Sequence, residues 1–135
     1  MGVLIDSSVL IDFERARIDP APHVQDREDE EFFISVITVS ELLHGVWSAT
    51  NRAIRSRRSA FVEAILERFP VLAIDLPTSR IHSQIWSDLE ARGIMIGLHD
   101  CWLAATCIAN DHSLVTSNLR DFKRIPGLRL ESWST

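Results

Sequence analysis

Short, uninterrupted apolar runs alternate with longer amphipathic stretches along the chain, and this alternation restricts the fold more than any other feature. Fully apolar runs of this length are typical of strands buried on both faces of a parallel sheet. Four such runs and one weaker candidate occupy residues 3–5, 32–34, 71–74, 114–116 and 128–130. Helical spacing of apolar residues covers residues 9–17, 38–47, 51–69, 77–92 and 100–110. The pattern predicts a three-layer α/β/α domain with a mostly parallel central sheet of four to five strands.

The size and composition suit one folded domain. The chain has 135 residues, of which 46% are apolar and 24% are charged, as in average globular proteins. We therefore expect a single domain over residues 1–135. Residues 18–30 contain two prolines and a run of charged residues, which predicts a solvated connection.

The cysteines and the N-terminus bear on the cellular compartment. Cys101 and Cys107 lie on one predicted helix and point about 240° apart around its axis, so they are not expected to pair. The first apolar run is too short for a signal peptide, and no stretch approaches the roughly 18 apolar residues of a membrane span. These features predict a reduced, cytoplasmic protein with no membrane segment.

The acidic balance excludes binding of nucleic acid by general phosphate neutralisation. The chain has 14 basic and 19 acidic residues and a net charge of −5, whereas proteins that bind in that way are basic. A metal ion or a local cationic patch would have to mediate contact with a polyanion. One predicted helix carries candidate RNA contacts, since arginine binds phosphate through two donors and stacks on bases. They are Arg52, Arg55, Arg57, Arg58 and Arg68. A solvated helix face explains them equally well.

Carboxylate and amide side chains stand where predicted strands end or predicted helices begin. Asp6 follows the first strand, and Asn118 and Asp121 follow the fourth. Glu41 lies in the first turn of the second predicted helix, and Asp100 starts the Ala-rich helix. Because α/β domains bind ligands where the ends of parallel strands meet, we expect these groups to converge. Oxygen donors without paired His or Cys favour Mg²⁺ or Mn²⁺ over zinc.

Each of these residues also has an ordinary structural explanation. Asp6 can cap a helix, and Thr38-x-x-Glu41 matches a capping box. Asp100 can complement a helix dipole, and the two residues after the fourth strand are common in turns. Convergence distinguishes the alternatives, because carboxylates about 4 Å apart repel by roughly 4 kcal/mol per pair at an effective dielectric constant near 20. Such a group needs a proton or a cation.

Four segments, in order along the chain, resemble the PIN-domain ribonucleases, specifically the VapC-type toxins of bacterial type II toxin–antitoxin pairs. They are residues 3–11 (VLIDSSVLI), 35–45 around SELLHG, 100–106 (DCWLAAT) and 114–122 (LVTSNLRDF). The resemblance implies a PIN fold in which Asp6, Glu41 and Asp100 bind one or two Mg²⁺ or Mn²⁺ ions.

Further site residues follow from the same resemblance. The position of Asn118 is acidic in many relatives, so Asn118 would here orient water at the metal, and Asp121 would supply a fourth carboxylate. Ser7 and Thr116 match small hydroxyl positions suited to a water or phosphate contact. Helix capping and strand-end hydrogen bonding explain these two hydroxyls equally well.

The resemblance also implies an activity and partners. The expected reaction is cleavage of structured RNA (tRNA or rRNA) by metal-activated water, leaving 5′-phosphate and 3′-hydroxyl ends. A VapB-like antitoxin would bind as an amphipathic helix in a groove on the second predicted helix and place a basic side chain in the acidic cleft. Simple core packing explains the apolar surface of that helix equally well. Homodimers are expected, and a heterotetramer or larger assembly with the antitoxin.

Two other functions fit parts of the pattern. A phospho-receiver domain also has an acidic Mg²⁺ pocket, but it needs an acidic pair after the first strand and a lysine near a late strand. Here two serines follow Asp6, and the only lysine is Lys123. A PIN fold kept as a non-catalytic scaffold is the second alternative, and retention of the three acids argues against it. The four tryptophans are expected in the core or in an interface.

Overall fold

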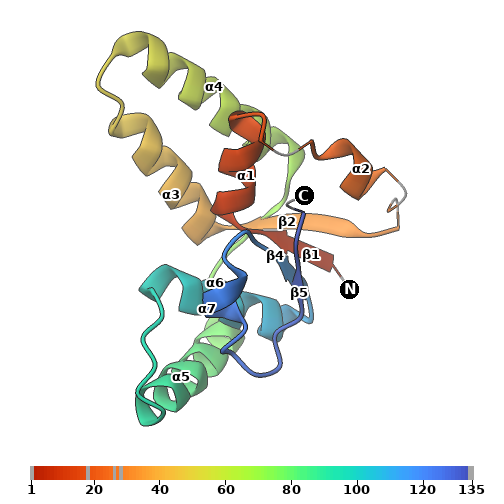
Figure 1. Ribbon diagram of the computed structural model, residues 1–135, viewed down its shortest axis with the longest axis vertical. Coiled ribbons are helices and arrows are strands. Elements are labelled where there is room, and N and C mark those ends of the chain that lie inside the picture. Colours follow the sequence, from red (N-terminus) through yellow and green to blue (C-terminus); the bar gives the residue numbers. More distant parts are fainter. Residues whose placement is uncertain (1, 18, 26, 28, 134–135) are drawn as a thin grey trace.

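A parallel sheet in the order β3-β2-β1-β4-β5 forms the centre of the computed structural model (Figure 1), which describes residues 2–17, 19–25, 27 and 29–133. The strands are β1 (Gly2–Ile5), β2 (Glu31–Ser35), β3 (Val71–Leu72), β4 (Ser113–Val115) and β5 (Leu130–Glu131). The chain starts in the middle strand and adds strands first on one side and then on the other, which is a doubly wound arrangement. The prediction of a mostly parallel sheet of four to five strands is confirmed.

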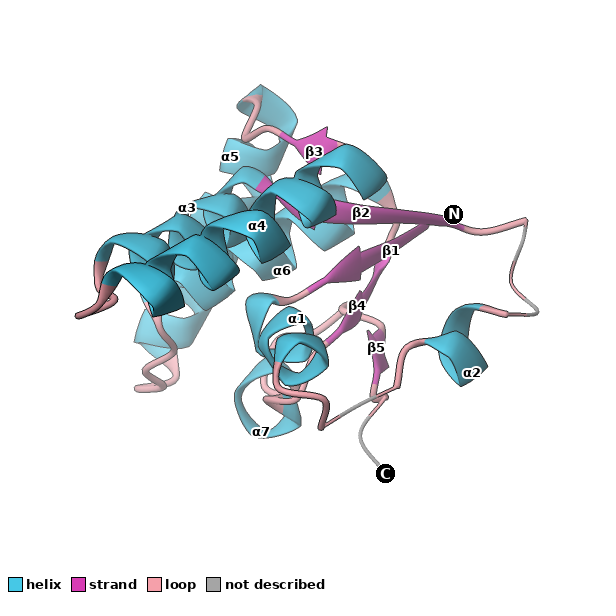
Figure 2. Cartoon of the chain, turned by 90° about the horizontal axis from the view of Figure 1, so that it is seen from above, coloured by secondary structure: helices cyan, strands magenta, loops and turns pink. Residues whose placement is uncertain are grey.

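Helices cover both faces of this sheet. They are α1 (Ser7–Glu14), α2 (Ala21–Val24), α3 (Val36–Trp47), α4 (Arg52–Arg68), α5 (Leu76–Ala91), α6 (Leu98–Asn110) and α7 (Leu119–Phe122). Figure 1 shows α1, α3 and α4 on one side of the sheet and α5, α6 and α7 on the other. Figure 2 shows that α3 and α4 lie side by side as a hairpin. The predicted three-layer α/β/α architecture is therefore confirmed.

The middle strand β1 divides its side chains between two hydrophobic clusters. Val3 and Ile5 pack with residues of α1, α3 and α4, whereas Leu4 packs with residues of α6 and α7. Alternate residues of a strand point to opposite faces, so a strand covered on both faces must be apolar throughout. This burial explains why uninterrupted apolar runs identify the central strands.

The start of α3 differs from the prediction and changes the role of Glu41. Strand β2 runs to Ser35, and the helix begins at once, with the Ser35 hydroxyl accepting a hydrogen bond from the Ile37 N–H. The predicted capping box of Thr38 and Glu41 is wrong, because both residues lie inside the helix. Glu41 stands in the second turn rather than the first, so its carboxylate is not used for capping.

Other elements also differ from the predictions. Residues 18–30, expected to be a solvated connection, include α2, whose prolines fall at the N-cap and in the first turn, where proline is tolerated. Residues 18, 26 and 28 of that stretch lie outside the described residues. Strand β3 ends earlier than expected and β5 begins later. A short helix, α7, follows the fourth strand where only a turn was expected.

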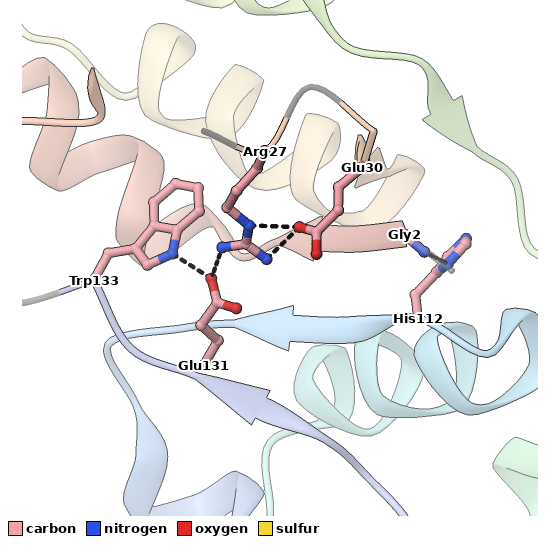
Figure 3. Close-up of polar contacts among 6 residues, drawn as sticks. All are labelled: Gly2, Arg27, Glu30, His112, Glu131 and Trp133. Atoms are coloured by element: carbon pink, nitrogen blue, oxygen red, sulfur yellow. Dashed lines mark hydrogen bonds and ion pairs between the residues drawn. The ribbon is translucent and has the colours of Figure 1, made fainter. Parts of the chain in front are cut away.

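A polar cluster attaches the C-terminal strand to the segment after α2 (Figure 3). The Arg27 guanidinium pairs with Glu30 and Glu131, and the Trp133 indole N–H donates to Glu131. Trp133 is buried in the first hydrophobic cluster, so the expected core position is confirmed for this tryptophan. Trp47, in contrast, is 72% exposed.

The cysteines are placed as predicted. Cys101 and Cys107 are both buried and unpaired. Burial raises the pKa of both thiols, and the negative charge of a nearby aspartate adds to the effect, so both stay protonated at neutral pH. No helix in the described ranges is long and apolar enough to span a membrane.

Replacing Gly2 with Ala is expected to destabilise the fold by about 1–3 kcal/mol, because the added methyl would overpack the amino end of the middle strand. A Cβ at this position would lie 2.7 Å from Phe33 Cε2 and 3.1 Å from His112 Cε1, beside the Gly2 N–H bond to His112 Nδ1 (Figure 3). Urea unfolding measures the loss. Gly45→Ala is the matched control: nothing lies within 4 Å of its Cβ position in α3, so it should stabilise the helix by about 0.5–1 kcal/mol. Equal effects of the two changes would contradict the steric argument.

Candidate active site

Asp6 occupies the N-cap of α1, but its side chain does not cap the helix. The backbone is extended there (φ −73°, ψ 151°), and only the Asp6 carbonyl accepts hydrogen bonds from the first helical turn. Its carboxylate oxygen Oδ2 instead accepts from Thr116 Oγ1 at 2.7 Å and from Ser8 Oγ at 3.0 Å. Asp6 is only 5% exposed. The capping explanation for this side chain is therefore wrong, and a buried carboxylate is held in place for another purpose.

Glu41 lies close to Asp6, and one hydroxyl stands between the two carboxylates. Ser7 Oγ is 3.3 Å from Glu41 Oε1 and 3.4 Å from Asp6 Oδ1. A serine hydroxyl has one proton, so it can donate to only one of these oxygens at a time. On its other side, Glu41 Oε2 is 3.5 Å from His99 Nδ1 of α6. The second turn of α3 thus brings Glu41 to the junction of α1 and α6.

Asp100, in the first turn of α6, completes the group together with Asn118 and Asp121. The Asn118 side-chain amide donates to Asp121 Oδ2 at 3.2 Å and to Asp100 Oδ2 at 3.4 Å. Burial raises the pKa of Asp100 to about 6, and the negative charges of Asp6, Glu41 and Asp121 add to this effect. A position in the first helical turn would by itself favour the ionised form. The helix-dipole explanation is therefore insufficient, because the surroundings shift the pKa in the opposite direction.

All five predicted site residues thus converge at one edge of the sheet. They come from the segments that follow β1, β2 and β4 and from the start of α6. In the part of the chain that the structure describes, no lysine or arginine forms an ion pair with any of the four carboxylates. The excess negative charge and the all-oxygen donor set fit a hard divalent cation. Among the same residues, no three acidic, His or Cys side chains are arranged so as to enclose an ion as they stand.

The two predicted hydroxyls and one further hydroxyl contact the carboxylates. Ser7 and Thr116 both lie against Asp6, as their positions beside the acids suggested. Ser8 was not among the predicted site residues, yet its hydroxyl donates to Asp6. The only signal for this contact in the sequence was that Ser8 lies two residues after Asp6, at the end of a predicted strand.

The arginine-rich helix α4 is partly used to hold the α3–α4 hairpin together. Arg55 Nη2 donates to the Ala49 carbonyl at 3.1 Å, and Arg58 Nη1 donates to the Gly45 carbonyl at 2.8 Å. Gly45 lies in the last turn of α3, and Ala49 follows the helix. Carbonyls at a helix end have no hydrogen-bond partner within the helix, and the two arginines supply one. A substitution at either position would therefore disturb the hairpin, whatever its effect on RNA binding. Arg52 and Arg57 are exposed.

Two cavities lie along α1 and α4. The larger, of about 810 Å³, is mainly apolar and is lined by residues of α1, α2, β2 and α4 and by Trp133. The smaller, of about 120 Å³, lies between α1, α3 and α4 and includes Glu41 and Arg58 in its lining. Successive turns of α4 contribute to both, with Val62 in the smaller and Phe61 and Ile65 in the larger. A partner that fills both cavities would reach Glu41.

Known proteins resemble this chain over almost its full length. The family model of the PIN domain matches residues 3–128. Ribonuclease VapC1 from Rickettsia felis is 36% identical over 130 residues, which cover 96% of this chain and 95% of that protein. The tRNA(fMet)-specific endonuclease VapC from Salmonella typhimurium is 33% identical over 82% of this chain and 84% of its own length.

The structural comparison gives the same result. The crystal structure of DNA-bound VapBC from Salmonella typhimurium matches with a TM-score of 0.89 at 28% identity and covers 98% of both chains. VapBC2 from Rickettsia felis, bound to a fragment of its promoter, also matches with a TM-score of 0.89, and at 24% identity it supports the fold alone. The sequence matches and the sheet topology agree: the chain belongs to the PIN-domain family and, within it, to the VapC ribonucleases.

Proposed function

We propose that this protein is a divalent-metal-dependent endoribonuclease that acts as the toxin of a VapBC-type pair. The observation that carries the proposal is the convergence of Asp6, Glu41, Asp100 and Asp121 without a lysine or arginine partner in the described residues. Close carboxylates repel one another unless a proton or a cation is present. Membership of the VapC ribonucleases supports RNA as the substrate.

The metal site would use Asp6, Glu41 and Asp100, with Asp121 as the fourth carboxylate. A bound Mg²⁺ or Mn²⁺ supplies neutralisation of the phosphodiester oxygens and a lower pKa for water. The protein's own contribution is orientation: Thr116 and Ser8 hold one oxygen of Asp6, and the Asn118 amide holds Asp100 and Asp121.

Structured RNA, tRNA in particular, is the proposed substrate class. One relative is named as a tRNA(fMet)-specific endonuclease, which supports this choice. Because the net charge is −5, contact with RNA must be local. Arg52 and Arg57 are the better candidates for that contact, since Arg55 and Arg58 already donate to backbone carbonyls. Cleavage is proposed to occur in the cytoplasm, as the sequence predicts.

A VapB-like antitoxin is the proposed partner, because the structural neighbours are VapBC complexes. We place its helix in the apolar cavity between α1 and α4, with a basic side chain reaching Glu41 through the smaller cavity. The second predicted helix corresponds to α3, which contributes Glu41, Leu42 and Gly45 to the lining of the smaller cavity. Homodimers, and larger assemblies with antitoxin, belong to the same proposal.

RNA cleavage by the purified chain tests the proposal. We expect tRNA to be cleaved in the presence of Mg²⁺ or Mn²⁺, to leave 5′-phosphate ends, and to stay intact when EDTA is added. Restoring excess Mn²⁺ should restore cleavage, which controls for damage by the chelator. Undiminished cleavage in EDTA would exclude the metal mechanism. Mn²⁺ binding without cleavage of any cellular RNA would favour the non-catalytic scaffold, and labelling by a phosphodonor would favour the receiver.

A further inference from the structure

The hydroxyl of Ser8 connects Asp6 to the loop between β4 and α7. Ser8 Oγ donates to Asp6 Oδ2 at 3.0 Å and at the same time accepts from the Ser117 N–H at 3.1 Å. Thr116 forms the parallel connection: its Oγ1 donates to the same oxygen at 2.7 Å and accepts from the Asn118 N–H at 2.9 Å. Each hydroxyl therefore has both its proton and a lone pair in use.

These bonds leave the two oxygens of Asp6 in different situations. Oδ2 accepts two hydroxyl protons, whereas among the described residues Oδ1 has only the long contact of 3.4 Å to Ser7, on the side of Glu41. A hydroxyl held by a backbone amide has one preferred direction for its proton, so two such donors fix the rotation of the carboxylate. Oδ1 is consequently presented toward the other carboxylates.

The same loop carries two further members of the site. Asn118 donates to Asp100 and Asp121, and its backbone N–H is bonded to Thr116. A shift of the loop would therefore change the rotation of Asp6 and the position of Asn118 together. Thr116 is buried within the sheet edge, whereas Ser8 reaches the loop from α1.

We propose that Ser8 is a positioning residue of the active site, which fixes the carboxylate of Asp6 relative to the β4–α7 loop and so prepares it to bind the divalent cation. The inference rests on the proposed function, because it assigns Asp6 to metal binding. In this proposal Ser8 acts through Asp6, to which its hydroxyl donates. Residues that orient metal ligands typically contribute about 10- to 100-fold in metal affinity or activity.

The test is Mn²⁺ binding by Ser8→Ala, measured by electron paramagnetic resonance, together with RNA cleavage kinetics. We expect the dissociation constant for Mn²⁺ to rise about 10-fold and kcat to fall by a similar factor, with KM for RNA unchanged. Ser8→Thr keeps the hydroxyl and should restore both values. Circular dichroism and thermal unfolding confirm that each variant is folded.

Ser117→Ala is the matched control, because it removes a different hydroxyl bond between the same loop and α1, that of Ser117 Oγ to Asp12 at 3.1 Å. It should bind Mn²⁺ like the unaltered chain. Unchanged Mn²⁺ binding by Ser8→Ala, or an equal loss in Ser117→Ala, would overturn the inference. So would a failure of Ser8→Thr to restore binding. No Mn²⁺ binding by the unaltered chain would instead overturn the proposed function, and the inference with it.

Discussion

Replacing Asp100 with Asn is expected to abolish RNA cleavage and, at the same time, to raise the thermal stability of the metal-free protein. Residues that only orient metal ligands contribute up to roughly 100-fold in activity. Loss of a proposed metal ligand itself should therefore lower the rate of cleavage by at least that factor. Stability should rise because the carboxylate is unfavourable in the folded state. Its pKa is raised to about 6 by burial and by the charges of Asp6, Glu41 and Asp121. An amide of the same shape carries no charge and can still accept from Asn118.

The sign and size of the stability effect follow from the pKa shift. The unfolded pKa of an aspartate is about 3.9, so the folded state holds the proton more tightly between about pH 4 and 6, and stability falls as pH rises through that window. Above pH 6, the loss of folding stability caused by the ionised Asp100 carboxylate reaches its full value. A shift of about two units corresponds to about 3 kcal/mol, and solvent screening at this half-buried site reduces the figure to about 1–2 kcal/mol. The melting temperature of Asp100→Asn should therefore exceed that of the unaltered chain by about 4–8 °C at pH 7.5.

Scanning calorimetry in EDTA at pH 7.5 and pH 4 measures this difference, which should disappear at the lower pH. Asp88→Asn is the matched control, because Asp88 lies on α5 and pairs with Arg92 at the surface. Exposed pairs contribute about 0–1 kcal/mol, so this change should slightly lower stability and leave cleavage intact. A melting temperature of Asp100→Asn below that of the unaltered chain at pH 7.5 would show that the carboxylates do not repel one another.

The central strands and the convergence of the acids could be predicted because one physical constraint determines both. A strand covered on both faces must be apolar, so Val3, Leu4 and Ile5 mark the middle of the sheet. Parallel strands end at one edge, so polar residues immediately after them, such as Asp6, meet residues from distant parts of the chain. The pairing of Thr116 with Asp6, which are 110 residues apart, is a result of this topology.

The helix cap, the ends of the edge strands and the arginine hydrogen bonds could not be predicted, because they depend on competition between local signals or on tertiary contacts. Thr38 and Glu41 match a capping box, but Ser35 caps the helix because β2 runs directly into it. The edge strands β3 and β5 are short, and their ends depend on tertiary contacts rather than on apolar runs. Residue type also does not reveal a hydrogen-bond partner. The sequence shows that Arg58 is cationic, but not that it donates to the Gly45 carbonyl.

Binding of Mn²⁺ is expected to weaken about 10-fold between pH 7.5 and pH 5. A cation binds the ionised carboxylate, so protons compete with it. Since the pKa of Asp100 is raised to about 6, the side chain is ionised in nearly all molecules at pH 7.5 but in only about one in ten at pH 5. An aspartate with an ordinary pKa near 3.9 would remain ionised throughout this range and would predict almost no change.

Isothermal titration at pH 7.5, 6 and 5 measures the affinity, and a comparison of two buffers with different ionisation enthalpies gives the number of protons released. At pH 6 about half a proton should leave per ion bound, because half of the Asp100 side chains are protonated there. Asp100→Asn is the internal control. Its weaker residual binding of Mn²⁺ should not release this half proton, since Asn cannot titrate. Constant affinity from pH 7.5 to 5, or the same pH dependence in Asp100→Asn, would show that Asp100 does not bind the ion.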